Sequence, residues 1–259
     1  MTISVNELFS VTGRTAVVTG ASSGLGHRFC RVLHAAGANV VAAARRQDRI
    51  DELAKDLGGD RVLAVRCDVA DEWERGRLVD EALRRFGAID ILVNNAGISS
   101  GGPAAGETLA GWQRVIDVNL TSVFALSRLA AGHMLKAGRG SIVNVASIYG
   151  LVAAAPMSQA SYSASKGGVV NLTRDLACQW SQGGVRVNAL APGWFPSELT
   201  HGVLTREDRR GADYIRRNTP MSRFGEEHEL DGALLFLASD ASSYVTGHTI
   251  AVDGGWTAH

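Results

Sequence analysis

The feature that most constrains the fold is an alternation, along nearly the whole chain, of short β-rich runs with amphipathic helical patterns. The runs are almost continuous in Val, Ile, Leu and Ala, which is typical of parallel strands buried on both faces. The predicted strands are Arg14–Thr19, Asn39–Ala44, Arg61–Val65, Asp90–Val93, Ser141–Ala146, Val185–Leu190 and His248–Val252. The helical windows are Gly24–Ala36, Asp48–Leu57, Asp71–Phe86, Leu109–Met134, Gln159–Ser181 and Glu226–Ala238. This order predicts right-handed βαβ units in one α/β domain over residues 1–259, with a doubly wound parallel sheet of about seven strands and helices on both faces.

Composition argues against several other classes of protein. The 26 basic and 26 acidic residues cancel, so no global charge attracts nucleic acid or an anionic membrane. We expect no membrane span and no secretory signal, and therefore a cytoplasmic protein. The seven histidines lack metal-ligand spacing, so no metal is expected. Cys30, Cys67 and Cys178 are too few and too dispersed for a disulfide framework, and we expect them to be buried thiols.

Two segments fit no regular element. Ser99–Thr108 is rich in Gly and Ala, and Trp194–Arg217 reads as a long irregular insertion before the last helix. Long loops of this kind commonly cover binding sites, although a disordered surface excursion is the alternative. The second segment contains aromatic and aliphatic side chains that can be buried against the rest of the protein, which argues against a disordered loop. We therefore predict that Trp194–Arg217 is a substrate lid.

A glycine-rich turn follows the first strand and opens the first helix. Glycine lets the backbone approach a pyrophosphate, and the N–H groups and dipole of a helix N-terminus favour its charge. Such a turn sometimes serves only to end a strand and begin a helix. Its place at the first βα junction favours dinucleotide binding and a Rossmann-like domain. The predicted contacts in this turn are Gly20, Ser22, Ser23, Gly24, Leu25 and Gly26.

The end of the second strand indicates which dinucleotide binds. A domain of this type that prefers NAD(H) carries an acid there for the ribose 2′-hydroxyl, whereas this chain reads Ala44, Arg45 and Arg46. A guanidinium can bind a 2′-phosphate through paired hydrogen bonds. The alternative is that both arginines merely begin an exposed helix. The chemistry favours NADP(H) over NAD(H).

Several motifs, taken in order, resemble those of the short-chain dehydrogenase/reductase family over essentially the full length of the chain. Each motif alone is weak, but the ordered set at near-family spacing is specific. The matching pieces are Thr19–Gly26, Asp68-Val69, Asn94-Asn95-Ala96-Gly97, Asn119, Ser147, Tyr162-x-x-x-Lys166, Pro192-Gly193 and Asp253-Gly254-Gly255. The resemblance implies hydride transfer between a nicotinamide cofactor and a carbonyl/alcohol pair.

The predicted catalytic residues also make chemical sense by themselves. A developing alkoxide needs a proton donor, and the reverse reaction needs a base. Tyr162 can serve if its pKa falls from near 10, and Lys166, on the same helical face, is predicted to lower that pKa. Ser147 would hydrogen-bond the substrate oxygen. The resemblance adds that Asn119 supports a proton-relaying water and that Lys166 bonds the nicotinamide ribose.

The resemblance assigns further cofactor contacts to residues that follow the later strands. Asp68 and Val69 match positions that flank the adenine, and Ser197 takes the place of a threonine near the nicotinamide amide. Asn95 is expected to tie the fourth strand to its neighbour. The complete set comprises Asp68, Val69, Asn95, Ala96, Gly97, Pro192, Gly193, Phe195 and Ser197.

One departure from the family pattern lies beside the predicted substrate. The spacing from Ser147 to Tyr162 is fifteen residues, longer than is usual in the family, and the extra residues fall within Val152–Ser161. Ser147 is kept as the catalytic serine because Ser147-x-x-Gly150 matches the family's strand end. The insertion reshapes the pocket, so the resemblance is a weaker guide to the substrate than to the reaction.

The sequence therefore predicts an NADP(H)-dependent enzyme that acts on a small ketone or secondary alcohol. Alternatives are a 3-oxoacyl carrier-protein reductase, which Gly138 and Gly183 argue against because arginines are expected there, and a sugar-acid dehydrogenase. A cofactor-binding regulator without catalysis is the non-enzyme alternative. The resemblance also implies a homodimer or homotetramer built largely through the helix that carries Tyr162, although packing on the sheet could account for much of that helix's apolar surface.

Overall fold

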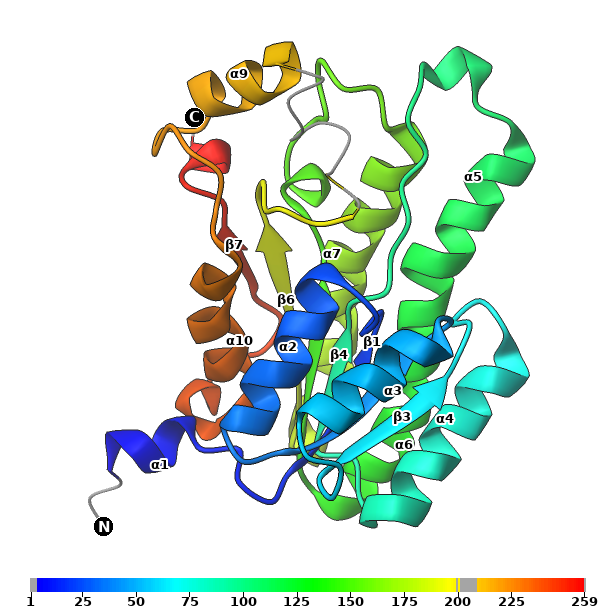
Figure 1. The fold of residues 1–259 in the computed structure, drawn as a ribbon, viewed down its shortest axis with the longest axis vertical. Coiled ribbons are helices and arrows are strands. Elements are labelled where there is room, and N and C mark those ends of the chain that lie inside the picture. Colours follow the sequence, from blue (N-terminus) through cyan, green and yellow to red (C-terminus); the bar gives the residue numbers. More distant parts are fainter. Residues whose placement is uncertain (1–3, 199, 201–208, 259) are drawn as a thin grey trace.

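The computed structural model describes residues 4–198, 200 and 209–258. Seven parallel strands form one sheet in the order β3-β2-β1-β4-β5-β6-β7 (Figure 1). The order reverses at β1, with β2 and β3 on one side and β4 to β7 on the other. This is the predicted doubly wound parallel sheet, and the reversal creates a crevice beside β1 where ligands of such sheets bind.

The strands lie within two residues of the predicted boundaries. They are β1 Thr15–Thr19, β2 Asn39–Ala44, β3 Val62–Arg66, β4 Ile91–Asn94, β5 Gly140–Val145, β6 Val185–Pro192 and β7 Thr249–Val252. All residues of β1 and β4 are buried, as expected for central parallel strands. The edge strand β7 is mostly half-buried.

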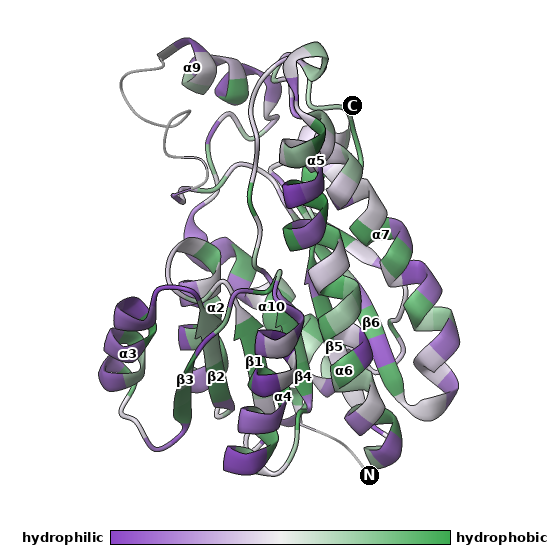
Figure 2. Cartoon of the chain, turned by 90° about the vertical axis from the view of Figure 1, so that its right-hand side faces the viewer, coloured by the Kyte–Doolittle hydropathy of each residue, from purple (hydrophilic) through white to green (hydrophobic). Residues whose placement is uncertain are grey.

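Helices cover both faces of the sheet. Those of the described residues are α1 Val5–Phe9, α2 Gly24–Ala35, α3 Gln47–Asp56, α4 Glu72–Phe86, α5 Leu109–Ile116, α6 Ser122–Ala137, α7 Ala160–Trp180, α9 Arg209–Asn218 and α10 Asp231–Ala238. Side chains of α2, α3 and α10 share one core with one face of the sheet, and those of α4, α6 and α7 share the other. Hydrophobic colour is concentrated in the strands, while α3 and α4 show hydrophilic residues outward (Figure 2).

Three predicted elements are corrected by the structure. The helix predicted over Leu109–Met134 is α5, a π-helical turn at Asp117–Thr121, and α6, which runs on to Ala137. The backbone stays helical through the turn, so the apolar period carries no sign of it. The helix predicted over Glu226–Ala238 begins with a 3₁₀ turn, Glu227–Leu230, before α10.

The third correction concerns the predicted irregular insertion Trp194–Arg217. It contains the start of α9, which runs from Arg209 to Asn218, while 199 and 201–208 lie outside the described residues. The short helix α1 was also missed, although Ser4 and Glu7 form a capping box there. Cys30 and Cys67 are buried as expected, but Cys178 is exposed on α7.

One helical stretch of the described residues, Leu109–Ala137, is long and apolar enough to cross a membrane by length and composition alone. Half of its apolar window is buried inside the fold. Its α6 part packs against the sheet through Val123, Leu126 and Met134. Burial of this kind is what a core helix of a globular domain shows, so the stretch is weak evidence for a span.

Candidate active site

A cavity of about 510 Å³ opens at the carboxyl ends of the strands, above the reversal at β1. Every residue predicted to bind the cofactor lines it. These are Gly20, Ser22, Ser23, Gly24, Leu25, Gly26, Arg45, Arg46, Asp68, Val69, Asn95, Ala96, Gly97, Tyr162, Lys166, Pro192, Gly193, Phe195 and Ser197. Ser147 lines the same cavity, so the predicted phosphate loop and the predicted catalytic groups share one cleft.

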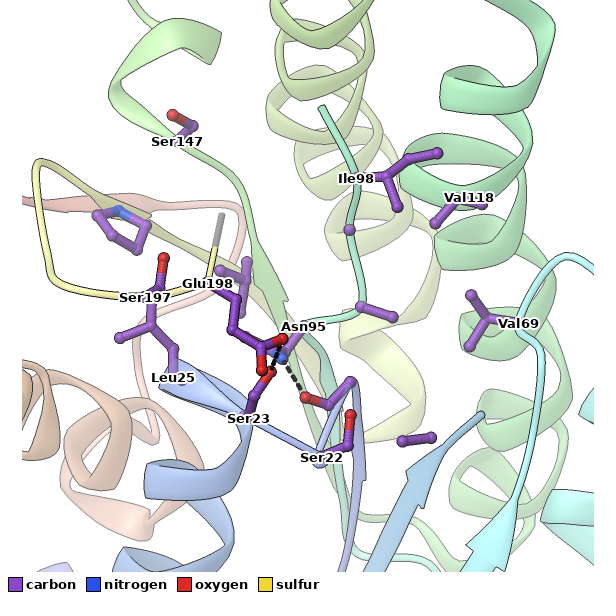
Figure 3. Close-up of a pocket in the computed structure, with 18 of the residues that line it drawn as sticks. Ser22, Ser23, Leu25, Val69, Asn95, Ile98, Val118, Ser147, Ser197 and Glu198 are labelled. Carbon is purple, nitrogen blue, oxygen red and sulfur yellow. Dashed lines mark hydrogen bonds between the residues drawn. The ribbon is translucent and has the colours of Figure 1, made fainter. Parts of the chain in front are cut away.

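The loop between β1 and α2 requires its glycines. Gly20 and Gly24 have φ of 69° and 51°, a region that favours glycine. A Cβ on Gly26 would lie 2.3 Å from the carbonyl oxygen of Gly20, so only glycine allows α2 to begin so close to the strand end. The start of α2 therefore borders the cleft, with Ser22 and Ser23 beside it (Figure 3), and a helix N-terminus in this place favours phosphate.

The end of β4 is fastened to this loop by hydrogen bonds to Thr19. The Asn95 side-chain amide donates to the Thr19 carbonyl oxygen at 2.8 Å. The Thr19 hydroxyl accepts from the backbone N–H groups of Asn95 and Ala96, both at 3.0 Å. Asn95 thus ties β4 to β1, as the resemblance implied.

Asp68 and Val69 follow β3 and form the cavity wall beyond β2. Burial raises the pKa of the Asp68 carboxyl, but a hydrogen bond from Ala70 N and the nearby Arg114 outweigh burial and leave the pKa lowered. Cys67 lies in the same wall, where burial raises the pKa of its thiol to about 12. Asp68 is therefore an anionic acceptor and Cys67 a neutral apolar surface.

The Arg46 side chain lines the cavity and lies against the glycine-rich loop. Its guanidinium bonds to the Ser22 hydroxyl at 3.0 Å, the Ser23 hydroxyl at 2.8 Å and both carboxylate oxygens of Glu198. The hydrogen bond to Glu198 raises the pKa of Arg46, and the hydrogen bond from Arg46 lowers the pKa of Glu198. Arg45 lines the cavity next to it and is exposed.

Ser147, Tyr162 and Lys166 lie at the inner end of the cavity, and all three are buried. Ser147 ends the segment after β5, where its hydroxyl accepts a hydrogen bond from Tyr149 N at 3.1 Å. Lys166 Nζ donates to the Val145 carbonyl oxygen at 2.7 Å and lies 5.7 Å from the centre of the Tyr162 ring. The ammonium is thus fixed between strand β5 and the phenol.

Burial corrects the predicted direction of one pKa shift. The pKa of Tyr162 is raised, because desolvation of the phenolate outweighs the lowering effect of a hydrogen bond with Ser147. The same burial lowers the pKa of Lys166 to about 8. The attraction between the ammonium and the phenolate favours both ions, but the desolvation of these buried groups disfavours both and decides the direction of each shift.

Asn119 lies in the π-helical turn, one layer behind the cavity wall, and is fully buried. Its side chain accepts from Ile98 N and donates to Ile98 O, both at 2.8 Å, and it also donates to the Ser165 hydroxyl at 3.1 Å. π-helical turns are rare and frequently mark functional sites. Asn119 therefore couples the loop after β4 to α7, near Lys166.

Gly150 explains the Ser147-x-x-Gly150 pattern. A Cβ at this position would lie 2.6 Å from the Lys166 carbonyl oxygen, so glycine lets the turn after Ser147 pack on the backbone of α7. The insertion that follows contacts other segments around the site. Ser158 O accepts from Gly102 N at 3.1 Å, and Gln159 accepts from the Ser99 hydroxyl at 3.1 Å.

An aromatic cluster packs around Tyr162. The rings of Tyr149, Trp194 and Trp256 pack edge to face, and Tyr214 of α9 packs on Trp256. These side chains belong to one apolar cluster with Tyr162 and with Ala154 of the insertion. The segment predicted as a lid therefore contributes Trp194 and Tyr214 to the surroundings of the phenol.

Sequence reasoning missed several residues that line the cavity. Glu198 and Thr200 extend the segment after Ser197, and no motif marks them. Apolar wall positions at strand ends and in the adjoining loops were missed because they follow from the fold, not from a pattern; these are Ala44, Cys67, Ile98, Val118, Val145 and Ala146. Among the described residues, no cluster of His, Cys, Asp and Glu could hold a metal ion.

Comparison with known proteins gives the family. A family model described as enoyl-(acyl carrier protein) reductase matches residues 20–257. Cis-4-hydroxycyclohexanecarboxylate dehydrogenase of Sinomonas cyclohexanicum is 44% identical and covers 95% of this chain and 97% of its own. A 3-oxoacyl-[acyl-carrier-protein] reductase of Synechocystis is 37% identical, covering 95% of this chain and 98% of its own. A gluconate 5-dehydrogenase from Burkholderia cenocepacia, solved in complex with NADP and tartrate, superimposes with a TM-score of 0.93 at 36% identity, covering 99% of this chain and 100% of its own.

A phosphate loop and a Ser–Tyr–Lys set in one cleft of a doubly wound sheet define a dinucleotide-binding α/β protein. The similar proteins are dehydrogenases and reductases, which makes the chain an NAD(P)-dependent oxidoreductase. The chain belongs to the short-chain dehydrogenase/reductase family.

Proposed function

We propose that this protein interconverts a secondary alcohol and its ketone with NADP(H). One observation carries the proposal: the buried Ser147, Tyr162 and Lys166 lie in the same cavity as the glycine-rich loop and Arg45 and Arg46. Bound at this loop, the nicotinamide cofactor supplies or accepts the hydride. The cavity fits such a cofactor, because the glycine-rich loop and the N-terminus of α2, which favours phosphate, line it together with Arg45 and Arg46.

The chain's own residues move the proton and position the substrate. Tyr162 donates its phenolic proton to the developing alkoxide, and its raised pKa keeps it protonated at neutral pH. Ser147 hydrogen-bonds the substrate oxygen beside the phenol. Lys166, held by Val145 O, places positive charge beside the ring and returns a proton to it through water supported by Asn119.

The preference for NADP(H) rests on charge. No acid stands at the end of β2, and both Arg45 and Arg46 line the cavity there. A gluconate 5-dehydrogenase similar to this chain is described with bound NADP, which supports the assignment. NADPH is expected to bind at least about tenfold more tightly than NADH, a difference of about 1.4 kcal/mol that one charge-assisted pair can supply.

Among substrates, the aromatic cluster favours a compound with an apolar ring or chain over a long polyol. Trp194, Tyr149 and Tyr214 present carbon-rich surfaces near Tyr162. The relative that acts on cis-4-hydroxycyclohexanecarboxylate agrees with a secondary alcohol on a six-membered ring. A sugar-acid substrate and a 3-oxoacyl chain on a carrier protein are the alternatives, supported by the named activities of other relatives.

The remaining expectations stay predictions. We propose that the segment over 194–217 covers the substrate as a lid of the single domain, and that the enzyme is cytoplasmic and homo-oligomeric. Two apolar residues of α7, Val169 and Leu176, are buried within the monomer and so belong to its own core. Leu172 and Trp180, which are half-buried, are apolar residues that an interface through α7 can use.

The catalytic assignment is tested by Tyr162→Phe, which removes only the hydroxyl. Cofactor binding and folding should survive while turnover falls by about two to four orders of magnitude. Tyr244→Phe, at a fully exposed tyrosine, is the matched control. If the Tyr162 variant keeps more than about a tenth of wild-type turnover with chemistry rate-limiting, Tyr162 is not the acid.

The cofactor assignment is tested by titrating NADPH and NADH against the wild type and Arg45→Ala. The variant should lose affinity for NADPH and keep its affinity for NADH. Arg84→Ala is the control, because Arg84 is exposed on α4 outside the cavity. Equal affinities in the wild type would refute the preference.

A further inference from the structure

Glu198 occupies a position in the cofactor cavity that no motif indicated. Arg46 Nη1 donates to its Oε1 at 3.0 Å, and Arg46 Nη2 donates to its Oε2 at 2.8 Å. The Ser23 hydroxyl donates to Oε2 at 2.9 Å. The Glu198 carboxylate therefore accepts from one edge of a guanidinium and from one hydroxyl of the phosphate loop.

These contacts join three segments that lie far apart in the chain. Glu198 follows β6, Ser23 precedes α2, and Arg46 follows β2. Figure 3 shows Glu198 reaching from the segment after β6 to Ser23 across the cleft. A Cβ on Gly24 would lie 3.2 Å from Ser197 Cβ, so this approach of the two segments involves the backbone and not one side chain alone.

The donors that hold Glu198 are those that a phosphate would use. A guanidinium edge binds carboxylate and phosphate in the same bidentate way, and serine hydroxyls bind both. Nε, Nη1 and Nη2 of Arg46 already donate hydrogen bonds, and their acceptors are Ser22, Ser23 and Glu198. A 2′-phosphate can therefore reach the full guanidinium edge only when the carboxylate leaves it.

The carboxylate is held loosely enough to be displaced. The side chains of Arg46 and Glu198 are 42% and 57% exposed, and exposed ion pairs contribute little stability. A phosphate carries more charge than a carboxylate and competes for the same donors. Once displaced, Glu198 still lies on the same cavity wall, where its negative charge opposes the phosphate.

We propose that Glu198 is a specificity-determining residue that competes with the 2′-phosphate of NADP(H) for Arg46. It weakens binding of NADP(H) and leaves binding of NAD(H) nearly unchanged, because NAD(H) has no phosphate at this position. Glu198 thereby reduces the cofactor preference that Arg45 and Arg46 create. The inference rests on the proposed use of NADP(H), and it concerns the size of the preference and not its existence.

The test is Glu198→Gln, which keeps the size of the side chain and removes its charge. Calorimetric titrations with 2′-AMP and 5′-AMP separate the 2′-phosphate from the rest of the cofactor, and fluorescence titrations with NADPH and NADH follow. We expect 2′-AMP and NADPH to bind about three- to fivefold more tightly to the variant, the range that an exposed ion pair allows. 5′-AMP and NADH should change by less than about 1.5-fold, because they do not compete for Arg46.

Glu52→Gln is the matched control, since Glu52 is an exposed residue of α3 outside the cavity and the variant has the same change in net charge. It should leave all four affinities unchanged. Unchanged or weaker binding of 2′-AMP to the Glu198 variant would overturn the inference, whichever cofactor the wild type prefers. Tighter 2′-AMP binding to the variant would support it even if the wild type showed no preference for NADPH, a result that would refute the proposed preference alone.

Discussion

Lys166→Met should make the protein more stable at neutral pH while abolishing its activity. Burial lowers the pKa of Lys166 from 10.5 to about 8, a difference of about 2.5 units. Each unit corresponds to about 1.4 kcal/mol of preference for the neutral form, so the charged side chain costs the folded state about 3 kcal/mol at pH 7. Methionine has a similar length and carries no charge, so it removes this cost.

Part of the gain is offset by contacts that methionine cannot make. The hydrogen bond from Lys166 Nζ to Val145 O is lost, and so is the contact between the ammonium and the Tyr162 ring. A buried hydrogen bond contributes about 1 kcal/mol, and a cation over an aromatic ring about 0.5–1 kcal/mol. The expected net gain in the free energy of unfolding is about 1 kcal/mol at pH 7.

The pH dependence gives the sharper prediction. The folded-state pKa of Lys166 lies below its unfolded value, so between about pH 8 and 10.5 the unfolded chain holds a proton that the folded protein has released. Wild-type stability therefore rises with pH in this window relative to the variant, and the cost of the charge is constant below it. The stability advantage of the variant should shrink by about 2 kcal/mol between pH 7 and 9.5, so that the wild type becomes the more stable protein at pH 9.5.

Urea denaturation of the cofactor-free protein at about pH 7 and pH 9.5, at one protein concentration, measures both quantities. Lys55→Met, at an exposed position of α3, controls for the loss of a lysine. The reasoning fails if Lys166→Met is less stable than the wild type at pH 7, or if the difference between them does not change with pH.

Gly26→Ala should weaken NADPH binding at least about tenfold and destabilise the fold by about 1–3 kcal/mol, because its Cβ would overlap Gly20 O. Gly76→Ala, where a Cβ meets nothing within 4 Å, is its control and should leave binding unchanged. Reductive kcat/KM should fall above about pH 8 as Lys166 loses its charge, and a profile flat to pH 9.5 would contradict this role. Hydrogen exchange in α9 should slow when cofactor and substrate bind, whereas unchanged protection would make the segment a fixed structural insertion.

The sheet and the position of the site at its carboxyl edge were predictable from the sequence. Parallel strands that are buried on both faces appear in the sequence as nearly continuous runs of apolar residues. Val, Ile, Leu and Ala fill β1, β2 and β4 almost without interruption, and the glycine-rich turn identifies the first crossover. Once the strands are placed in order, their carboxyl ends meet at one edge. The motifs that follow β1, β4, β5 and β6 therefore had to converge, and they line one cavity.

The features that sequence reasoning missed depend on contacts between distant segments. The π-helical turn at Asp117–Thr121 preserves helical dihedral angles and so leaves the apolar period intact. The Arg46–Glu198 pair joins residues 152 positions apart, and either residue alone looks like an exposed charge. The pKa of Tyr162 depends on burial, which no spacing between Tyr162 and Lys166 reveals.

The costly features of this chain gather around the predicted chemistry. Lys166 is a buried cation, Asn119 lies in an irregular turn of a helix, and Gly150 is in close backbone contact with Lys166 O. Residues that conflict with the usual preferences for burial and regular structure occur mainly where function requires them. The stability that they cost is offset by packing elsewhere in the fold. The seven-stranded core supplies that stability here. Removing the buried charge of Lys166 should therefore raise stability and lower turnover, and the opposite combination would mean that the ammonium serves the fold.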